Sequence, residues 1–302
     1  MIENRQASKN GILVYPVYSR RSRGLSLGIN LFPDEKQCSF DCPYCEVFPF
    51  STNAVFSAEQ MEEDLRSAVS SCLSEKVSVK DICFSGNGEP TQSTHFPDAL
   101  KLAAAVRAEM VPDANLVLIT NGAGLLDKRI FSLLQEAAFS PGLDIWLKVD
   151  AGTQLWYEKM NRSEIPFEEI ILKIKEFAAC APFTIQAMLC AVDGSGPPPE
   201  ESEAWEKLIV ELAAIAETSV VNGKGGGIRK VQIYGKARPA PEDPKAAALP
   251  EKQLEARSVS LRRALDVAFA SATASALTGA DAAFASALTG AADTPPQVEV
   301  YP

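Results

Sequence analysis

The sequence predicts an α/β fold organised around a mainly parallel sheet, and three observations support this. Short apolar runs typical of strands alternate with longer segments of helical spacing along most of the chain. Polar residues and glycines follow several of these runs, which is where the active sites of parallel α/β proteins lie. With 302 residues and 46% hydrophobic content, the chain can bury a full core.

The chain is predicted to enter the sheet through an extended segment and a first strand. Residues 12–18 form the extended segment, because Pro16 cannot donate a hydrogen bond and is disfavoured inside a sheet. Residues 25–31 alternate in polarity and are predicted to be the first strand. A loop with three cysteines follows this strand directly.

Further strands and helices complete the predicted alternation. The strands are expected at residues 79–84, 115–119, 144–149, 183–189 and 230–234. The helices are expected at residues 57–73, 96–110, 127–139, 167–179, 202–216 and 250–269. Strands that alternate with helices in this way favour a parallel sheet with right-handed crossovers. The resulting six βα units are too few for an eight-unit barrel.

The end of the chain is treated separately from this domain. Residues 1–269 are assigned to the α/β domain with its N-terminal extension, and residues 270–302 to an alanine-rich tail. The sequence ASALTGA occurs at 274–280 and again at 285–291, and its polar residues argue against a membrane span. We expect a partly helical or disordered insertion without chemistry. Residues 297–301 are expected to dock as an edge strand.

Composition and charge indicate which cellular compartment and which kinds of partner to expect. The formal net charge of −10 disfavours a general attraction to nucleic acids. Arg20, Arg21 and Arg23 form a local basic cluster, either a solvated edge or an anion-binding site. The polar residues 1–10 argue against a signal peptide or a membrane anchor there. Because the chain has 7 cysteines, an odd number with three clustered, we expect a reducing, cytoplasmic location.

The loop over residues 38–45 is the strongest indication of chemistry. Cys38, Cys42 and Cys45 have the spacing CxxxCxxC, and thiolates this close in sequence can converge on one soft metal centre. Structural zinc sites and most electron-transfer clusters use four protein ligands, so three cysteines leave one position for something else. A zinc site completed by a remote residue, or three thiols without metal, are the alternatives.

This motif, with Tyr44 directly before the third cysteine, resembles that of the radical S-adenosylmethionine (SAM) enzymes. The resemblance implies an α/β partial (β/α)6 barrel, similar to an incomplete TIM barrel. It also implies a [4Fe-4S] cluster ligated by Cys38, Cys42 and Cys45. In that family SAM chelates the fourth iron, and Tyr44 would lie near the adenine.

A second motif follows the strand predicted at residues 79–84. Its residues are Gly86, Asn87, Gly88 and Glu89, and they resemble the GGEP-type motif whose backbone groups hold the methionyl ammonium of SAM. Asn87 replaces one glycine of that motif, although asparagine tolerates the same backbone region. The resemblance makes these four residues candidates for binding the cofactor.

Polar residues also follow the next two predicted strands. By resemblance, Asn121 and Asp150 are candidate cofactor-binding residues and Lys148 is the candidate catalytic residue. A lysine in a low-dielectric site can have a lowered pKa and act as a base, a Schiff-base former or an anion clamp. The alternative is a pair of Lys148 and Asp150 that faces solvent.

Other residues are weaker candidates. Asn161 and Arg162 are expected on a mobile loop beside the substrate. Further candidates for contacts to adenine, substrate or an anion are Gln186, Met188, Gln232, Tyr234 and Arg238. For Met188, packing in the core is favoured over such a contact. We interpret His95 as an ordinary residue at a helix start, and the cysteines outside the motif as small buried residues.

The segment from Val17 to Cys45 and several later motifs also resemble the radical SAM subgroup related to wybutosine biosynthesis. The predicted function is reductive cleavage of SAM to a 5′-deoxyadenosyl radical that abstracts hydrogen from an unidentified small-molecule or macromolecular substrate. The electron is expected from a partner such as flavodoxin or ferredoxin. The alternatives are a tRNA-modifying enzyme of the wybutosine type, disfavoured by the acidic charge, and a non-catalytic iron-sulfur or zinc-binding module.

Overall fold

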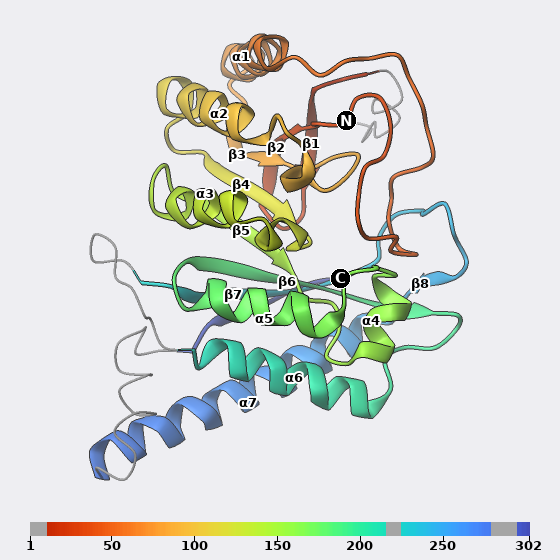
Figure 1. Ribbon diagram of the computed structural model, residues 1–302, viewed down its shortest axis with the longest axis vertical. Coiled ribbons are helices and arrows are strands. Elements are labelled where there is room, and N and C mark those ends of the chain that lie inside the picture. The colour runs from red at the N-terminus through yellow and green to blue at the C-terminus, as the bar shows by residue number, and fades with distance from the viewer. Residues whose placement is uncertain (1–10, 216–224, 279–294) are drawn as a thin grey trace.

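The chain forms one curved sheet with helices stacked along its outer side (Figure 1). The computed structural model describes residues 11–215, 225–278 and 295–302. The strands are β1 Val14–Ser19, β2 Gly24–Ile29, β3 Val79–Phe84, β4 Asn115–Thr120, β5 Leu143–Lys148, β6 Pro182–Val192, β7 Gly227–Gly235, β8 Ala246–Ala248 and β9 Gln297–Tyr301. The helices are α1 Ala58–Ser74, α2 Phe96–Met110, α3 Lys128–Phe139, α4 Gln154–Met160, α5 Phe167–Ala178, α6 Pro199–Ala213 and α7 Glu251–Thr278.

Parallel pairing runs through most of the sheet. The strands follow the order β1-β2-β3-β4-β5-β6-β7-β9, and β8 is attached to β6. The strands from β2 to β7, and β9 beside β7, pair in parallel, whereas β1 is antiparallel to β2. The sheet therefore curls as an open half barrel, and the predicted α/β class is confirmed.

The observed elements differ from the expected ones mainly at their ends. The segment expected to be a simple lead-in is strand β1, and Pro16 is tolerated there because β1 lies at the edge of the sheet. Helix α4 was not predicted; Thr153 caps it by accepting a hydrogen bond from Trp156 N at 3.2 Å. The last helix continues to Thr278, beyond its expected end, and β9 confirms the expected edge strand.

Some expectations fall outside the described residues. These are the polar start of the chain at 1–10, the last two residues of the first ASALTGA copy at 279–280, the second copy at 285–291, and residue 216 of the helix expected at 202–216. Among the described helices, none is long and apolar enough to span a bilayer.

The two faces of the sheet bury different side chains. On the helix side, large residues such as Leu27, Ile82 and Phe84 are completely buried in the main core. The inner face carries a small separate cluster of Cys83, Val117 and Trp146. The helix side therefore provides most of the hydrophobic stabilisation of the fold.

Buried polar side chains on the strands bond to one another. Ser26 donates a hydrogen bond to Asp81 across β2 and β3. Gln186 donates to Gln232 at 2.8 Å, and Arg21 from the turn after β1 donates to Gln186 at 3.0 Å. These bonds replace the water that the groups lose on burial.

The loop between β2 and α1 is attached to the ends of the strands by backbone hydrogen bonds. Gln37 forms an isolated bridge with Gly88, in which Gln37 N donates to Asn87 O at 3.2 Å and Glu89 N donates to Gln37 O at 2.8 Å. A Cβ added at Gly88 would lie 1.9 Å from the carbonyl oxygen of Gln37. The second glycine of the motif is therefore required by the approach of the cysteine loop.

We predict that Gly88→Ala lowers thermal stability, because the added methyl group pushes the Gln37 backbone away. Overpacking of this kind costs about 2 kcal/mol, which corresponds to a fall in Tm of several degrees. Circular dichroism melts measure the change. The matched control is Gly196→Ala, whose added Cβ has its nearest neighbour at 3.4 Å. Equal melting temperatures for the two variants would contradict the assigned role of Gly88.

Candidate active site

The three cysteines lie on the loop that follows β2. Cys45 N donates to Cys42 O at 3.0 Å, which makes a tight turn between the second and third cysteines. Burial raises the pKa of Cys38 to about 12 and that of Cys42 to about 11. Both thiols are therefore protonated at neutral pH until a cation compensates for the negative charge of the thiolate.

Side-chain amides that follow β4 and α4 face two of the sulfurs. Asn121, directly after β4, places its Nδ2 3.5 Å from Sγ of Cys38. Asn161, directly after α4, places its Nδ2 3.6 Å from Sγ of Cys42. The backbone N–H of Phe40 also donates to Cys38, at 3.4 Å. Hydrogen bonds of this kind stabilise negative charge on sulfur, which is the state of a metal-bound thiolate.

The thiol groups of the loop are ligands suited to a soft metal, although their sulfur atoms are not arranged around one point. Within the ranges that the structure describes, no group of three or more His, Cys, Asp or Glu side chains is arranged to hold a metal ion. Three thiols within one short loop, two of them with amide donors, are nevertheless the ligands that iron-sulfur clusters use. His95 is not a further ligand, because it lies at the start of α2 as expected and packs on Phe56 with 4.9 Å between ring centroids.

Glu89 is buried, and its carboxylate holds the ends of β3 and β4 together. Oε1 accepts from Thr91 N at 3.1 Å, from Thr91 Oγ1 at 2.6 Å and from Thr120 Oγ1 at 2.7 Å. Oε2 accepts from Asn121 N at 2.7 Å. Burial raises the pKa of Glu89 in spite of these donors. The carboxylate thus orients Asn121, and a direct contact between Glu89 and a cofactor stays a prediction.

Asp150 is the corresponding carboxylate at the end of β5. Oδ1 accepts from Met188 N at 2.8 Å and from Lys148 Nζ at 3.2 Å. Oδ2 accepts from Asn161 Nδ2 at 2.9 Å and from the hydroxyl of Tyr44. Asp150 therefore connects β5 and β6 with the cysteine loop, and a direct contact with a cofactor is untested for both Asp150 and Tyr44.

Lys148 is charged and paired. Its Nζ also donates to the hydroxyl of Tyr234 at 2.6 Å and lies 4.9 Å from the ring centroid of Tyr44. Burial lowers the pKa of Lys148, but Asp150 and Tyr234 outweigh burial and raise it above the usual value. The pKa of Lys148 is thus raised instead of lowered, and the pair is buried, with 13% and 0% of the two side chains exposed, instead of facing solvent. A charged lysine suits an anion clamp better than a base or a Schiff-base former.

Gly86 and Asn87 form the turn after β3. Gly86 has a φ of +132°, which glycine adopts without strain. Asn87 N donates to Oδ1 of Asn30 at 3.1 Å, and its Nδ2 donates to Phe32 O at 3.2 Å. Asn30 was missed at the sequence level, because only the pairing of β2 with β3 brings it to this turn. Cofactor binding by Gly86, Asn87 and Gly88 stays a prediction.

The weaker candidates are dispersed. Asn161 is buried against the cysteine loop, and Arg162 pairs with Glu242 at 2.6 Å, so a contact of either residue with a substrate stays a prediction. The basic cluster is divided, because Arg21 turns toward Gln186 whereas its neighbours Arg20 and Arg23 are exposed.

The remaining candidates have structural contacts. Gln186, Gln232 and Met188 are buried, and Arg238 pairs with Glu46 at 3.1 Å. The four cysteines outside the motif are buried or half-buried free thiols: Cys72, Cys83, Cys180 and Cys190.

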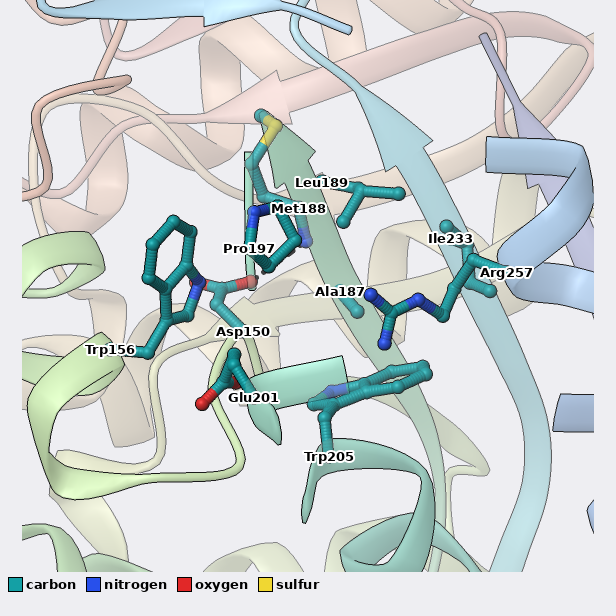
Figure 2. A pocket seen from close by; sticks show the side chains of 10 residues that line it. All are labelled: Asp150, Trp156, Ala187, Met188, Leu189, Pro197, Glu201, Trp205, Ile233 and Arg257. Carbon is teal, nitrogen blue, oxygen red and sulfur yellow. Dashed lines mark hydrogen bonds between the residues drawn. The ribbon is translucent and has the colours of Figure 1, made fainter. Parts of the chain in front are cut away.

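A small pocket of about 20 Å³ lies between β6 and helices α6 and α7 (Figure 2). Asp150, Glu201 and Trp205 are among the side chains that line it. The volume is enough for one water molecule and far too small for a cofactor. Glu201 uses its carboxylate to accept hydrogen bonds from Gly152 N and Thr153 Oγ1, each at 2.6 Å, so this region supports the loop after β5.

Comparisons with known proteins support the fold. No protein-family model matches the chain. Curated proteins described as UPF0026 protein, from Helicobacter pylori strains 26695 and J99, are each 29% identical over 177 residues, which is 56% of this chain and 52% of theirs. The chain thus spans about half the length of these relatives. A crystal structure of a radical SAM methyltransferase from Sphaerobacter thermophilus matches with a TM-score of 0.56 at 13% identity, over 83% of this chain and 66% of that one.

The structural match shows the fold alone. The open α/β half barrel is that of the radical SAM partial TIM barrel, as the cysteine motif implied. None of these three relatives is named for wybutosine biosynthesis, so that finer resemblance stays a prediction.

Lys148→Met is expected to destabilise the protein by about 3 kcal/mol, because it leaves the buried carboxylate of Asp150 without its cation. Urea unfolding measures the change. Lys173→Met is the control: Lys173 pairs with Glu176 at 2.6 Å, but both side chains are substantially exposed. We expect a change within about 0.5 kcal/mol for this control. A loss for Lys148→Met no larger than that of the control would refute a stabilising role for the buried pair.

Proposed function

We propose that the protein is a radical SAM enzyme that cleaves SAM reductively at a [4Fe-4S] cluster held by Cys38, Cys42 and Cys45. The observation that carries the proposal is the cysteine loop, in which the sulfurs of Cys38 and Cys42 each face a side-chain amide. The fold, a half barrel like that of a radical SAM methyltransferase, is consistent with it.

Residues around the loop have binding roles in this proposal. Tyr44 lies near the adenine of SAM, and backbone groups of Gly86, Asn87 and Gly88 hold its methionyl ammonium. Asn121 borders the same site at the end of β4. Glu89 supports the position of Asn121, because its carboxylate accepts a hydrogen bond from the Asn121 backbone.

Lys148 acts as an anion clamp in the proposal. Its ammonium stays charged beside Asp150 and is held in place by the hydroxyl of Tyr234 at 2.6 Å. A fixed positive charge in a site with little water attracts a carboxylate or phosphate of the ligand strongly. Asp150 contributes by keeping Lys148 oriented.

The chemistry supplied by the bound cluster is one-electron reduction of SAM, which gives methionine and a 5′-deoxyadenosyl radical for hydrogen abstraction. The protein orients SAM and a small-molecule or macromolecular substrate and excludes water from them. A partner such as flavodoxin or ferredoxin supplies the electron in a reducing cytoplasm. The tRNA-modifying alternative is not adopted, since the basic cluster is divided and the net charge is −10.

Anaerobic reconstitution of the full chain with iron and sulfide tests the proposal. We expect about four iron and four sulfide ions per chain, in keeping with a [4Fe-4S] cluster. The electron paramagnetic resonance (EPR) signal of the reduced protein should change when SAM is added. With dithionite as reductant, chromatography should detect methionine and 5′-deoxyadenosine.

Cysteine variants provide the control for this experiment. Cys42→Ala should lose the cluster, whereas Cys180→Ala, which removes a half-buried thiol outside the motif, should keep it. A protein that binds one zinc and no iron would overturn the proposal in favour of a zinc-binding module. A cluster whose spectrum ignores SAM would favour an electron-transfer module.

A further inference from the structure

The orientation of the Asn121 amide is fixed by its neighbours. Oδ1 of Asn121 accepts from Ala123 N at 2.9 Å, so the amide oxygen must face that N–H. The other end of the amide, Nδ2, is then directed at Sγ of Cys38 at 3.5 Å. The hydrogen bond from Asn121 N to Glu89 at 2.7 Å holds the backbone of the same residue. The amide of Asn121 thus faces Cys38 with a donor.

The amide of Asn161 is fixed in a comparable way from another part of the fold. Its Nδ2 must face the carboxylate of Asp150, which accepts from it at 2.9 Å. A carboxamide nitrogen carries two hydrogens, and the second is shared between Sγ of Cys42 at 3.6 Å and the hydroxyl of Tyr44 at 3.5 Å. The backbone carbonyl oxygen of Asn161 accepts a hydrogen bond from Asp41 N at 2.9 Å. This bond fixes the backbone directly before Cys42.

We propose that Asn121 and Asn161 are positioning residues that donate N–H···S hydrogen bonds to Cys38 and Cys42 and thereby raise the reduction potential of the cluster. This inference rests on the proposed function, because it requires a cluster on these cysteines. Reduction adds negative charge that the sulfurs share, so a donor to sulfur stabilises the reduced state more than the oxidised state. The two amides therefore make the cluster easier to reduce.

Two variants test the effect of the N–H donors on the cluster separately from any effect on the stability of the fold. Asn121→Asp keeps an oxygen that accepts from Ala123 N, but replaces the donor facing Cys38 by a negatively charged oxygen. Asn161→Leu removes the donor to Cys42, together with the donor to Asp150, with little change in side-chain size. EPR-monitored redox titration of the reconstituted full chain measures the midpoint potential. We expect the equilibrium constant for one-electron reduction to fall about three- to tenfold in Asn161→Leu, tenfold being about 59 mV. The fall should be larger in Asn121→Asp.

A matched control and the wild type separate the possible outcomes. Gln232→Leu removes a buried amide that bonds to Gln186 instead of to a sulfur, and should leave the potential unchanged. Wild-type protein that assembles no cluster would overturn the proposed function itself. A wild-type cluster with unchanged potentials in both asparagine variants would overturn this inference alone, even if cluster content falls. If Asn161→Leu does not fold, as judged by circular dichroism, the potential of Asn121→Asp decides the question.

Discussion

A carboxylate removed from water costs several kcal/mol unless hydrogen-bond donors replace the water, and the chain buries two carboxylates where its strands end. Glu89 and Asp150 each accept hydrogen bonds from four donor groups. These donors come from different elements, so each carboxylate fixes several chain segments relative to one another. The rest of the candidate site follows from this constraint, because its amides, hydroxyls and ammonium lie where the two carboxylates need partners.

The cysteine loop gains its order from the same groups. Between β2 and α1 it has little regular structure, and its own hydrogen bonds are few. Its attachments include those of Gln37 to the backbone beside Gly88, of Asp41 to Asn161, and of Tyr44 to Asp150. These attachments lie directly beside the first, second and third cysteines. A loop held next to each candidate ligand can place three thiols reproducibly without a helix or strand of its own.

The sequence predicted the parallel order and the cysteine loop because both depend on local patterns. Strand propensity and helical spacing are read within one segment, and the cysteine spacing lies within eight residues. The role of Asn161 was missed, because its position depends on α4, a seven-residue helix with too few turns for a clear period. A lowered pKa was one possibility for Lys148, but Asp150 and Tyr234 raise its pKa instead. The contact with Tyr234 could not be predicted, because Tyr234 reaches Lys148 only through the pairing of β5, β6 and β7.

Fold and chemistry are supported by different parts of the molecule. A TM-score of 0.56 at 13% identity describes the path of the backbone, and one fold can carry many activities. The inner-face groups Arg21, Gln186 and Gln232 bond to one another, so they contribute rigidity. The groups that can select a reaction are therefore those at the strand ends. Of these, the thiol loop, in which the sulfurs of Cys38 and Cys42 face fixed amide donors, carries the proposed metal chemistry, since a purely structural loop gains little from donors directed at neutral thiols.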